Sequence, residues 1–178
     1  MISVTYGLYW VQQWRHARAK RHKSSAFRVR PALEVIRGGL PWCIGFTALD
    51  IGPRNMEEVR LLETVFARVD AVDLLPTDSR IHRGRMERLP FPDKRYDLVF
   101  LSHVFEHAYD PRRAVSEIRR VLKRPGYVWI AVPQGFEANP HDRRYEPGEL
   151  VALFGDDQLT LWWKADPHEL QWLFQVAQ

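Results

Sequence analysis

Residues 96–103 read YDLVFLSH, and this stretch decides the class of fold. It is an almost unbroken apolar run, which is typical of a central strand in a parallel sheet, because helices cover both faces of such a strand. Shorter β-prone runs lie on either side of it, at residues 46–52, 68–74, 81–84 and 127–133, and helical stretches separate most of them. This alternation predicts βαβ units and an α/β fold with a mostly parallel sheet.

Two helices have clear start signals in the sequence. Asn55 is placed to cap a helix that follows the first strand, and Glu58 stands three residues later in the capping-box position. Asp110 and Pro111 are typical of the cap and the first residue of a second helix, which we expect to end near Leu122.

The C-terminal part predicts a different ending for the sheet. A short helix is expected at residues 148–154, followed by two β-prone runs at 158–166 and 169–177 with a Pro-containing turn between them. Two such runs joined by a turn are typical of a hairpin, so we expect the sheet to end in an antiparallel pair.

Composition places the chain among ordinary globular proteins. Its 178 residues are 46% apolar, which is enough for one domain with its own core. Cys43 is the sole cysteine, which excludes an intrachain disulfide and a zinc cage built from cysteines. We see no secretory signal and no apolar stretch near the roughly 20 residues that cross a bilayer. We therefore expect a soluble, cytoplasmic protein without a membrane span.

Positive charge is concentrated near the N-terminus. Residues 14–37 hold eight of the 26 Lys and Arg residues and one of the 22 acidic residues, so this segment carries +7 and the remainder −3. We expect residues 1–45 to form a basic helical arm packed on a domain made of residues 46–178. The arm could contact an anionic or phosphorylated ligand, such as RNA, a nucleotide sugar or a membrane surface, or it could be only a solvated helix face.

Several of the expected strands end in polar or turn-forming residues. In an open parallel sheet, ligands bind beyond the carboxyl ends of the strands. Gly52 allows a tight turn and close approach of the backbone to a ligand, and Asp73, at the end of the next strand, is placed to accept hydrogen bonds from ribose hydroxyls. These features favour a nucleoside site, although strand-terminal acids also serve simply as helix caps. The strand-end residues are Asp50, Gly52, Asp73, Ser102, His103, Pro133 and Gln134.

Four segments, taken together, resemble a known family. They are ALDIG (48–52), AVDLLP (71–76), GRMERLPFPDKRYDLVFLSHVFEH (84–107) and DPRRAVSEIRRVLKRPGYVWIAVP (110–133). In order and content they are similar to class I S-adenosylmethionine-dependent methyltransferases, in particular the small-molecule branch called type 11. The resemblance covers residues 48 to about 153. It implies a Rossmann-like three-layer sandwich with a mostly parallel seven-stranded sheet and an antiparallel C-terminal hairpin.

The resemblance also implies a cofactor and its contacts. The cofactor would be S-adenosylmethionine, with S-adenosylhomocysteine as product. Asp50 and Gly52 would line its amino-acid part, Asp73 its ribose and Met86 the face of its adenine, while His103 would lie near the sulfonium and the incoming substrate. The full expected set is Asp50, Gly52, Pro53, Arg54, Asp73, Leu74, Met86, Ser102 and His103.

Three features depart from the family's pattern. The first loop, usually Gly-x-Gly-x-Gly, reads GPRNM over residues 52–56, where Arg54 could pair with the cofactor carboxylate. The acid that usually binds the adenine amino group falls at Arg85, which cannot accept a hydrogen bond. Glu57 and Glu58 favour the helix that they begin but would repel the carboxylate of the cofactor.

His103 and His107 are the candidates for a catalytic base. Methyl transfer from a sulfonium is a direct displacement, so the protein mainly aligns the reactants, and a base is needed only when the acceptor carries a proton. The two histidines, four residues apart, would share a face with Glu106 beside them if this segment is helical. They could instead only satisfy nearby backbone groups. We expect no metal site.

A second polar cluster lies between the fifth strand and the next helix. In the resembling enzymes this region commonly covers the acceptor, so we expect His141, Arg144 and Tyr145 to contact the substrate. With Arg143, Arg144 forms a cationic pair that favours an anionic or phosphorylated substrate. A loop without such a role is the alternative.

Three hypotheses for function follow. The first is a methyltransferase that acts on a small molecule such as a sugar or another biosynthetic intermediate. The second is a non-catalytic, methyltransferase-like subunit that binds a partner through its altered first loop or its basic arm. The third is an RNA methyltransferase that uses residues 14–37 as its electrostatic footprint. An Asn/Asp-Pro-Pro-Tyr motif is absent after the fourth strand, which argues against N-methylation of a base.

Overall fold

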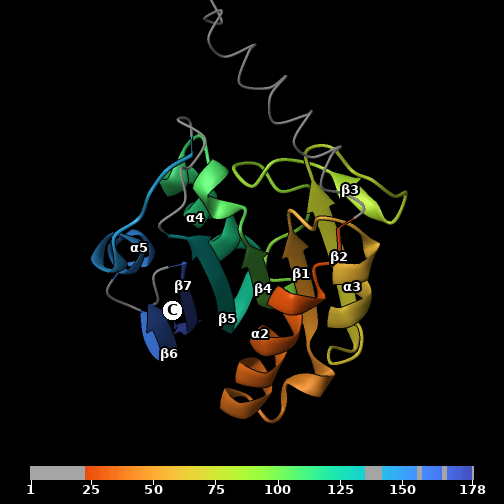
Figure 1. Ribbon diagram of the computed structural model, residues 1–178, viewed down its shortest axis with the longest axis horizontal. Coiled ribbons are helices and arrows are strands. Elements are labelled where there is room, and N and C mark those ends of the chain that lie inside the picture. The colour runs from red at the N-terminus through yellow and green to blue at the C-terminus, as the bar shows by residue number, and fades with distance from the viewer. Residues whose placement is uncertain (1–22, 135–141, 156–157, 166–167, 178) are drawn as a thin grey trace, which may run out of the picture.

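The computed structural model describes residues 23–134, 142–155, 158–165 and 168–177. Within these residues, seven strands form one sheet in the order β3-β2-β1-β4-β5-β7-β6 (Figure 1). The strands are β1 (Thr47–Ile51), β2 (Arg68–Asp73), β3 (Ile81–Arg83), β4 (Tyr96–Ser102), β5 (Leu122–Pro133), β6 (Gln158–Ala165) and β7 (Glu169–Val176). The helical elements are α2 (Ala26–Gly39), α3 (Met56–Leu62), α4 (Pro111–Val121) and α5 (Pro147–Phe154), with the 3₁₀ turns η1 (Cys43–Gly45) and η2 (Phe105–His107).

The strand directions confirm the predicted fold. Every neighbouring pair from β3 to β5 is parallel, and β7 is antiparallel to both β5 and β6. Because β7 runs against β5, its first residue, Glu169, pairs with Pro133 at the end of β5. The start of β7 therefore lies at the same edge of the sheet as the carboxyl ends of the parallel strands.

The packing of β4 explains why its sequence is almost wholly apolar. Leu98 and Phe100 join the core that contains residues of α2 and α3, whereas Val99 and Leu101 join the core that contains residues of α4 and α5. All four side chains are fully buried. The sheet thus has a helical layer on each face, as in the predicted three-layer sandwich, and α2 crosses in front of it in Figure 1.

The helix starts follow the predicted caps, with one correction. The Asn55 side chain accepts a hydrogen bond from the Glu57 amide at 3.0 Å, and Asp110 accepts one from the Arg113 amide at 3.1 Å. The predicted capping box at Asn55 is wrong. The Glu58 carboxylate accepts instead from the Arg54 amide at 3.4 Å, because the side chain turns back toward the buried side of the first loop.

The fifth strand begins earlier than residue 127, where the sequence predicted its start. Leu122 already pairs with Tyr96, and the register shifts before the next pair, Leu98 with Tyr127. Pro125 and Gly126 lie inside this irregular stretch rather than in a turn before the strand. A proline is tolerated there because its missing N–H falls at a break in the ladder.

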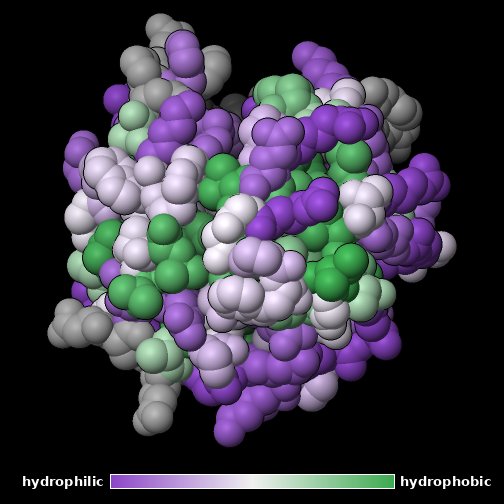
Figure 2. All heavy atoms as spheres, turned by 90° about the horizontal axis from the view of Figure 1, so that it is seen from below, coloured by the Kyte–Doolittle hydropathy of each residue, from purple (hydrophilic) through white to green (hydrophobic). Residues whose placement is uncertain are grey.

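The apolar surface is divided into patches. The edge strand β6 carries three exposed apolar side chains, Leu159, Leu161 and Trp163. Seen from below, separate green patches alternate with purple residues (Figure 2). Among the described residues, no helix has the length and apolar character that spanning a membrane requires.

The cap of α4 gives a test of this local structure. Replacing Asp110 with Ala removes the acceptor for the Arg113 amide, and we expect the free energy of unfolding to fall by about 1 kcal/mol. Urea denaturation followed by circular dichroism measures the change. Asp110→Ser, which keeps a capping oxygen, should lose less than half as much, and an equal loss in both variants would contradict the assignment.

Candidate functional site

The turn after β1 is built around Gly52. The Gly52 amide donates a hydrogen bond to the Val72 carbonyl at 2.8 Å, and its φ of 73° lies in the left-handed region. A Cβ at this position would lie 2.3 Å from Cγ2 of Val104, the residue that leads into η2. Only glycine meets both conditions, so the backbone passes unusually close to the segment that follows β4.

Three carboxyl groups are buried around this turn. Asp50 is fully buried, and Glu58 and Glu106 are each 4% exposed. In the described part of the chain, neither Asp50 oxygen has a hydrogen-bond partner, and Oε1 of Glu58 and Oε2 of Glu106 also lack one. Buried polar atoms are almost always paired, so these carboxyl groups are suited to donors or positive charge on a ligand.

Burial sets the protonation of these acids. It raises the pKa of Asp50 well above its ordinary value, and the charges of Glu58 and Asp73 add to the rise. Burial also raises the pKa of Glu58 to about 7. For Glu106, burial again raises the pKa, while the neighbouring histidines oppose the rise. Burial therefore favours the protonated forms of these acids, and a cationic ligand would favour their charged forms.

Asp73 lies where the sequence predicted. It is the last residue of β2, and its Oδ1 accepts a hydrogen bond from the Leu75 amide at 2.5 Å. Burial raises the pKa of Asp73, and its charge acts on Asp50. The structure thus brings the two predicted strand-end acids into one electrostatic environment. Leu74, the next residue, is half-buried.

The residues expected around adenine follow β3. The Gly84 amide donates to the Asp73 carbonyl at 3.0 Å, which ties this segment to the end of β2. Met86 is partly buried against the core, and Arg85 forms an isolated bridge with Arg88. Met86 therefore lies two residues after a glycine that is hydrogen-bonded to Asp73, the residue predicted to bind the ribose. The contact of Met86 with adenine stays a prediction.

The first loop is tied to the start of α2. Guanidinium Nη1 of Arg54 donates to the Ser24 carbonyl at 3.4 Å, and the Asn55 amide group donates to the Lys23 carbonyl at 3.2 Å. The Glu57 carboxylate accepts from the Ser25 amide at 2.8 Å and from the Ser24 hydroxyl at 3.0 Å. Pro53 is buried beneath these contacts. Pairing of Arg54 with a cofactor carboxylate stays a prediction.

These contacts change how the two acids of the loop act. The hydrogen bond from the Ser25 amide lowers the pKa of Glu57. The negative charge of Glu57 is therefore stabilised by a contact within the chain. Glu58, with a pKa of about 7, is close to half protonated at neutral pH. The expected repulsion of a ligand carboxylate by Glu57 and Glu58 is correspondingly reduced.

His103 and His107 do not share a helical face, because the segment that holds them is not a helix. Only residues 105–107 form a 3₁₀ turn, and His103 precedes it in the left-handed region with a φ of 53°, which interrupts any helix. Nε2 of His103 lies 2.8 Å from Oε2 of Glu169. Nδ1 of His107 lies 2.8 Å from Oδ1 of Asp142.

Glu169 and Asp142 are the site residues that sequence reasoning missed. Glu169 begins β7, and the antiparallel direction of the predicted hairpin was the signal that its start reaches this edge. Asp142 lies in the segment before α5, where periodicity carries no signal. Both histidines thus have a carboxylate partner, and Ser102 lies half-buried beside His103 at the end of β4.

The predicted substrate residues lie in different surroundings. His141 is outside the described residues. Arg144 is exposed, whereas Tyr145 is 3% exposed with its ring centroid 5.4 Å from that of Phe105. Burial raises the pKa of Tyr145, and its hydroxyl lacks a partner within the described part of the chain. Their contact with a substrate stays a prediction.

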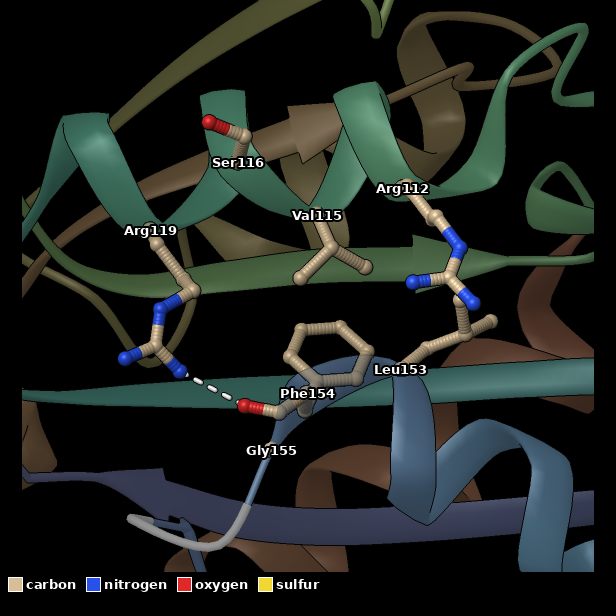
Figure 3. Close-up of a pocket in the computed structure, with 7 residues that line it drawn as sticks. All are labelled: Arg112, Val115, Ser116, Arg119, Leu153, Phe154 and Gly155. Atoms are coloured by element: carbon tan, nitrogen blue, oxygen red, sulfur yellow. Dashed lines mark hydrogen bonds between the residues drawn. The ribbon is translucent and has the colours of Figure 1, made fainter.

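A groove of about 410 Å³ lies apart from these residues, between α4 and α5. Figure 3 shows Arg112 and Arg119 pointing from α4 toward the end of α5 on either side of Phe154. Nη1 of Arg119 donates to the Phe154 carbonyl at 2.6 Å and so stabilises the last turn of α5. None of the predicted site residues lines this groove.

Comparison with known proteins identifies the domain. Residues 45–130 match the family described as methyltransferase domain. The match supports a class I S-adenosylmethionine-dependent methyltransferase domain in this chain. The match spans the Gly52 turn, the buried acids and the end of β4, and it confirms the predicted family.

Individual relatives agree with this family. The chain is 36% identical over 84 residues to the methyltransferase YcgJ of Bacillus subtilis, which is 47% of this chain and 29% of that protein. The matched parts cover 29%, 55% and 49% of three curated relatives, so the chain spans about half of their length or less.

Two solved structures share the fold. An S-adenosylmethionine-dependent methyltransferase from Aquifex aeolicus superposes with a TM-score of 0.72 at 15% identity, over 92% of this chain and 98% of that chain. The 1,6-didemethyltoxoflavin-N1-methyltransferase of Burkholderia thailandensis was solved with 1,6-didemethyltoxoflavin and S-adenosylhomocysteine. It superposes with a TM-score of 0.71 at 20% identity, over 95% of this chain and 86% of that chain.

The Gly52 turn can be tested by adding one methyl group. We expect Gly52→Ala to lower the free energy of unfolding by about 2 kcal/mol or more, because left-handed strain alone costs about 1–2 kcal/mol and the Val104 contact adds to it. Gly38→Ala is the matched control, since a Cβ there meets nothing within 4 Å. Urea denaturation measures the free energy of unfolding of both variants. Equal values would contradict the role of the Gly52 turn.

Buried Glu58 gives a pH dependence of stability. Its pKa in the folded chain, about 7, lies above the ordinary value of 4.5, so the folded state holds a proton that the unfolded state releases. This contribution is fully present below about pH 4.5 and is lost as the pH rises through 7. Between these pH values we expect the free energy of unfolding of the wild type to fall by an amount on the order of 1–3 kcal/mol because of Glu58. Glu58→Gln should not show this fall.

Urea denaturation at pH 5 and pH 8 measures this difference. Glu57→Gln is the matched control, because Glu57 is less buried than Glu58 and its pKa is lowered by hydrogen bonds rather than raised by burial. An unchanged pH slope in Glu58→Gln would show that Glu58 is not the group that carries it.

Proposed function

We propose that this protein transfers the methyl group of S-adenosylmethionine to a small-molecule acceptor. The observation that carries the proposal is Asp50, a fully buried acid without a partner in the described part of the chain, next to the close turn at Gly52. S-adenosylmethionine is a cation at its sulfonium and its ammonium group, which are the charges that buried acids favour.

The residues around the turn fit the cofactor in the order that the resemblance implies. Asp50 and Gly52 would hold its amino-acid part, Asp73 would accept from the ribose hydroxyls, and Met86 would cover the adenine. When bound, the cofactor supplies an electrophilic methyl group. The chain then orients the acceptor and excludes water, which is the main contribution that an enzyme makes to a direct displacement.

A small-molecule acceptor is supported over RNA by the surroundings of α2. Arg28 of this helix is half-buried, and burial together with the charge of Arg54 lowers its pKa. The acids Glu169, Glu106 and Glu58 oppose this shift, which places the guanidinium among the acids of the site. Arg28, which belongs to the basic arm, therefore interacts with acidic residues of this same chain. The Burkholderia relative in fold, which binds 1,6-didemethyltoxoflavin, gives further support.

We also propose that residues 1–45 complete the domain rather than form a separate module. The part of this arm that the structure describes packs on α3 through α2 and is hydrogen-bonded to the first loop through residues 23–25. An anionic or phosphorylated group would meet the arginines of this arm, or Arg144, at the same edge of the sheet. The expected substrate contacts of His141 and Tyr145 belong to this proposal.

Isothermal titration calorimetry with S-adenosylhomocysteine tests the proposed function. We expect saturable binding to the wild type and a loss of about 10- to 100-fold in affinity for Asp73→Ala, because a hydrogen bond to a charged acceptor contributes about 1.5–3 kcal/mol. Asp78→Ala is the matched control, since the carboxylate of this exposed acid accepts from the nearby Arg80 amide. Absence of heat at millimolar ligand would favour the non-catalytic, methyltransferase-like subunit instead.

A further inference from the structure

The contact between His103 and Glu169 joins two elements that are distant in sequence. His103 follows β4, Glu169 begins β7, and β5 lies between these strands in the sheet. The two side chains meet at 2.8 Å because β7 is antiparallel and starts at the carboxyl edge of β4 and β5. They are 13% and 23% exposed, so the pair is partly shielded from water.

Both partners are held in place by other contacts. The His103 amide donates to the Ala131 carbonyl at 2.8 Å, which fixes its backbone in the left-handed region. The Gln171 side chain donates to Oε1 of Glu169 and leaves Oε2 for the imidazole. A left-handed backbone is uncommon for a residue other than glycine, and such conformations cluster at functional sites.

This contact selects one tautomer of His103. Oε2 of an ionised Glu169 can only accept, so Nε2 carries the hydrogen, and Nδ1 keeps its lone pair. Among the described residues, Nδ1 of His103 has no hydrogen-bond partner. His107 differs, because its Nδ1 faces Asp142 at 2.8 Å and its Nε2 lies 3.8 Å from Oε1 of Glu106. Both ring nitrogens of His107 thus face a carboxylate, whereas within the described residues only Nε2 of His103 does.

We infer that Glu169 is a positioning residue that turns His103 into the base for an acceptor whose reacting oxygen or nitrogen carries a proton. This inference rests on the proposed function. Nδ1 of His103 takes the proton, and the electron pair left on the acceptor forms the new bond to the methyl carbon. The electron pair of the carbon–sulfur bond that breaks stays on sulfur. The Glu169 carboxylate stabilises the imidazolium until its proton passes to water.

Diethyl pyrocarbonate, which acylates unprotonated imidazole nitrogens, is the probe for this arrangement. Mass spectrometry of peptides from the full chain gives a separate rate for each histidine. At about pH 8–9, where imidazoles are mostly unprotonated, we expect His103 to react roughly tenfold faster in the wild type than in Glu169→Gln, because loss of the carboxylate makes Nδ1 a weaker nucleophile. Equal rates at His103 in the two proteins would overturn the inference.

A matched variant separates this effect from damage to the fold. Asp142→Asn removes the carboxylate from the other histidine, so it should change the rate at His107 and leave His103 unchanged. Circular dichroism checks that each variant is folded. If Asp142→Asn slowed His103 as much as Glu169→Gln does, the activation would not come from Glu169 and the inference would fail.

Protection by S-adenosylhomocysteine distinguishes this inference from the function on which it rests. Saturating ligand should slow acylation of His103 several-fold if the histidine lies beside the sulfur. Calorimetric binding without protection would overturn the role of His103 as base while leaving methyl transfer in place. If the ligand did not bind but acylation of His103 were still fast and dependent on Glu169, the proposed function would be overturned. The role of the His103–Glu169 pair in methyl transfer would then fail with it.

Discussion

The close passage of Gly52 against Val104 is the constraint on which the carboxyl edge of this sheet depends. A glycine in the left-handed region brings the end of β1 within contact of the segment after β4, with no room for a side chain between them. Asp50, two residues before this glycine, is fully buried, and α3 begins after Asn55, three residues beyond it. The acids of the site therefore share one shielded environment, which raises the pKa values of Asp50 and Glu58 through burial.

The start of α2 completes this edge from outside. The residues that lead into α2 are partners of the first loop, and hydrogen bonds from Ser24 and Ser25 stabilise the carboxylate of Glu57. Arg28 reaches the acids from the same helix. A loop that lacks two of the usual glycines is in this way compensated by contacts with a neighbouring helix rather than by backbone flexibility.

Sequence patterns predicted where the strands lie in the chain and that the sheet is mostly parallel with an antiparallel end, because burial on two faces leaves a strong apolar signal, as in β4. They also placed Asp50, Gly52 and Asp73 correctly at strand ends, since these positions follow from where each strand stops. Side-chain partners were harder. Glu169 is 66 residues from His103, and their contact depends on how β7 packs beside β5, which no local period encodes. The two histidines after β4 do not share a helical face, because one left-handed residue, His103, rules out a helix that includes it.

The hairpin that brings Glu169 to the site also leaves β6 as the last strand of the sheet. One side of β6 is paired with β7, so the other side presents a row of backbone donors and acceptors beside Leu159, Leu161 and Trp163. An apolar strand of this kind is a template on which a further extended segment can be added. The same chain reversal that builds the site thus leaves, among the described strands, an edge with exposed apolar side chains that is suited to self-association.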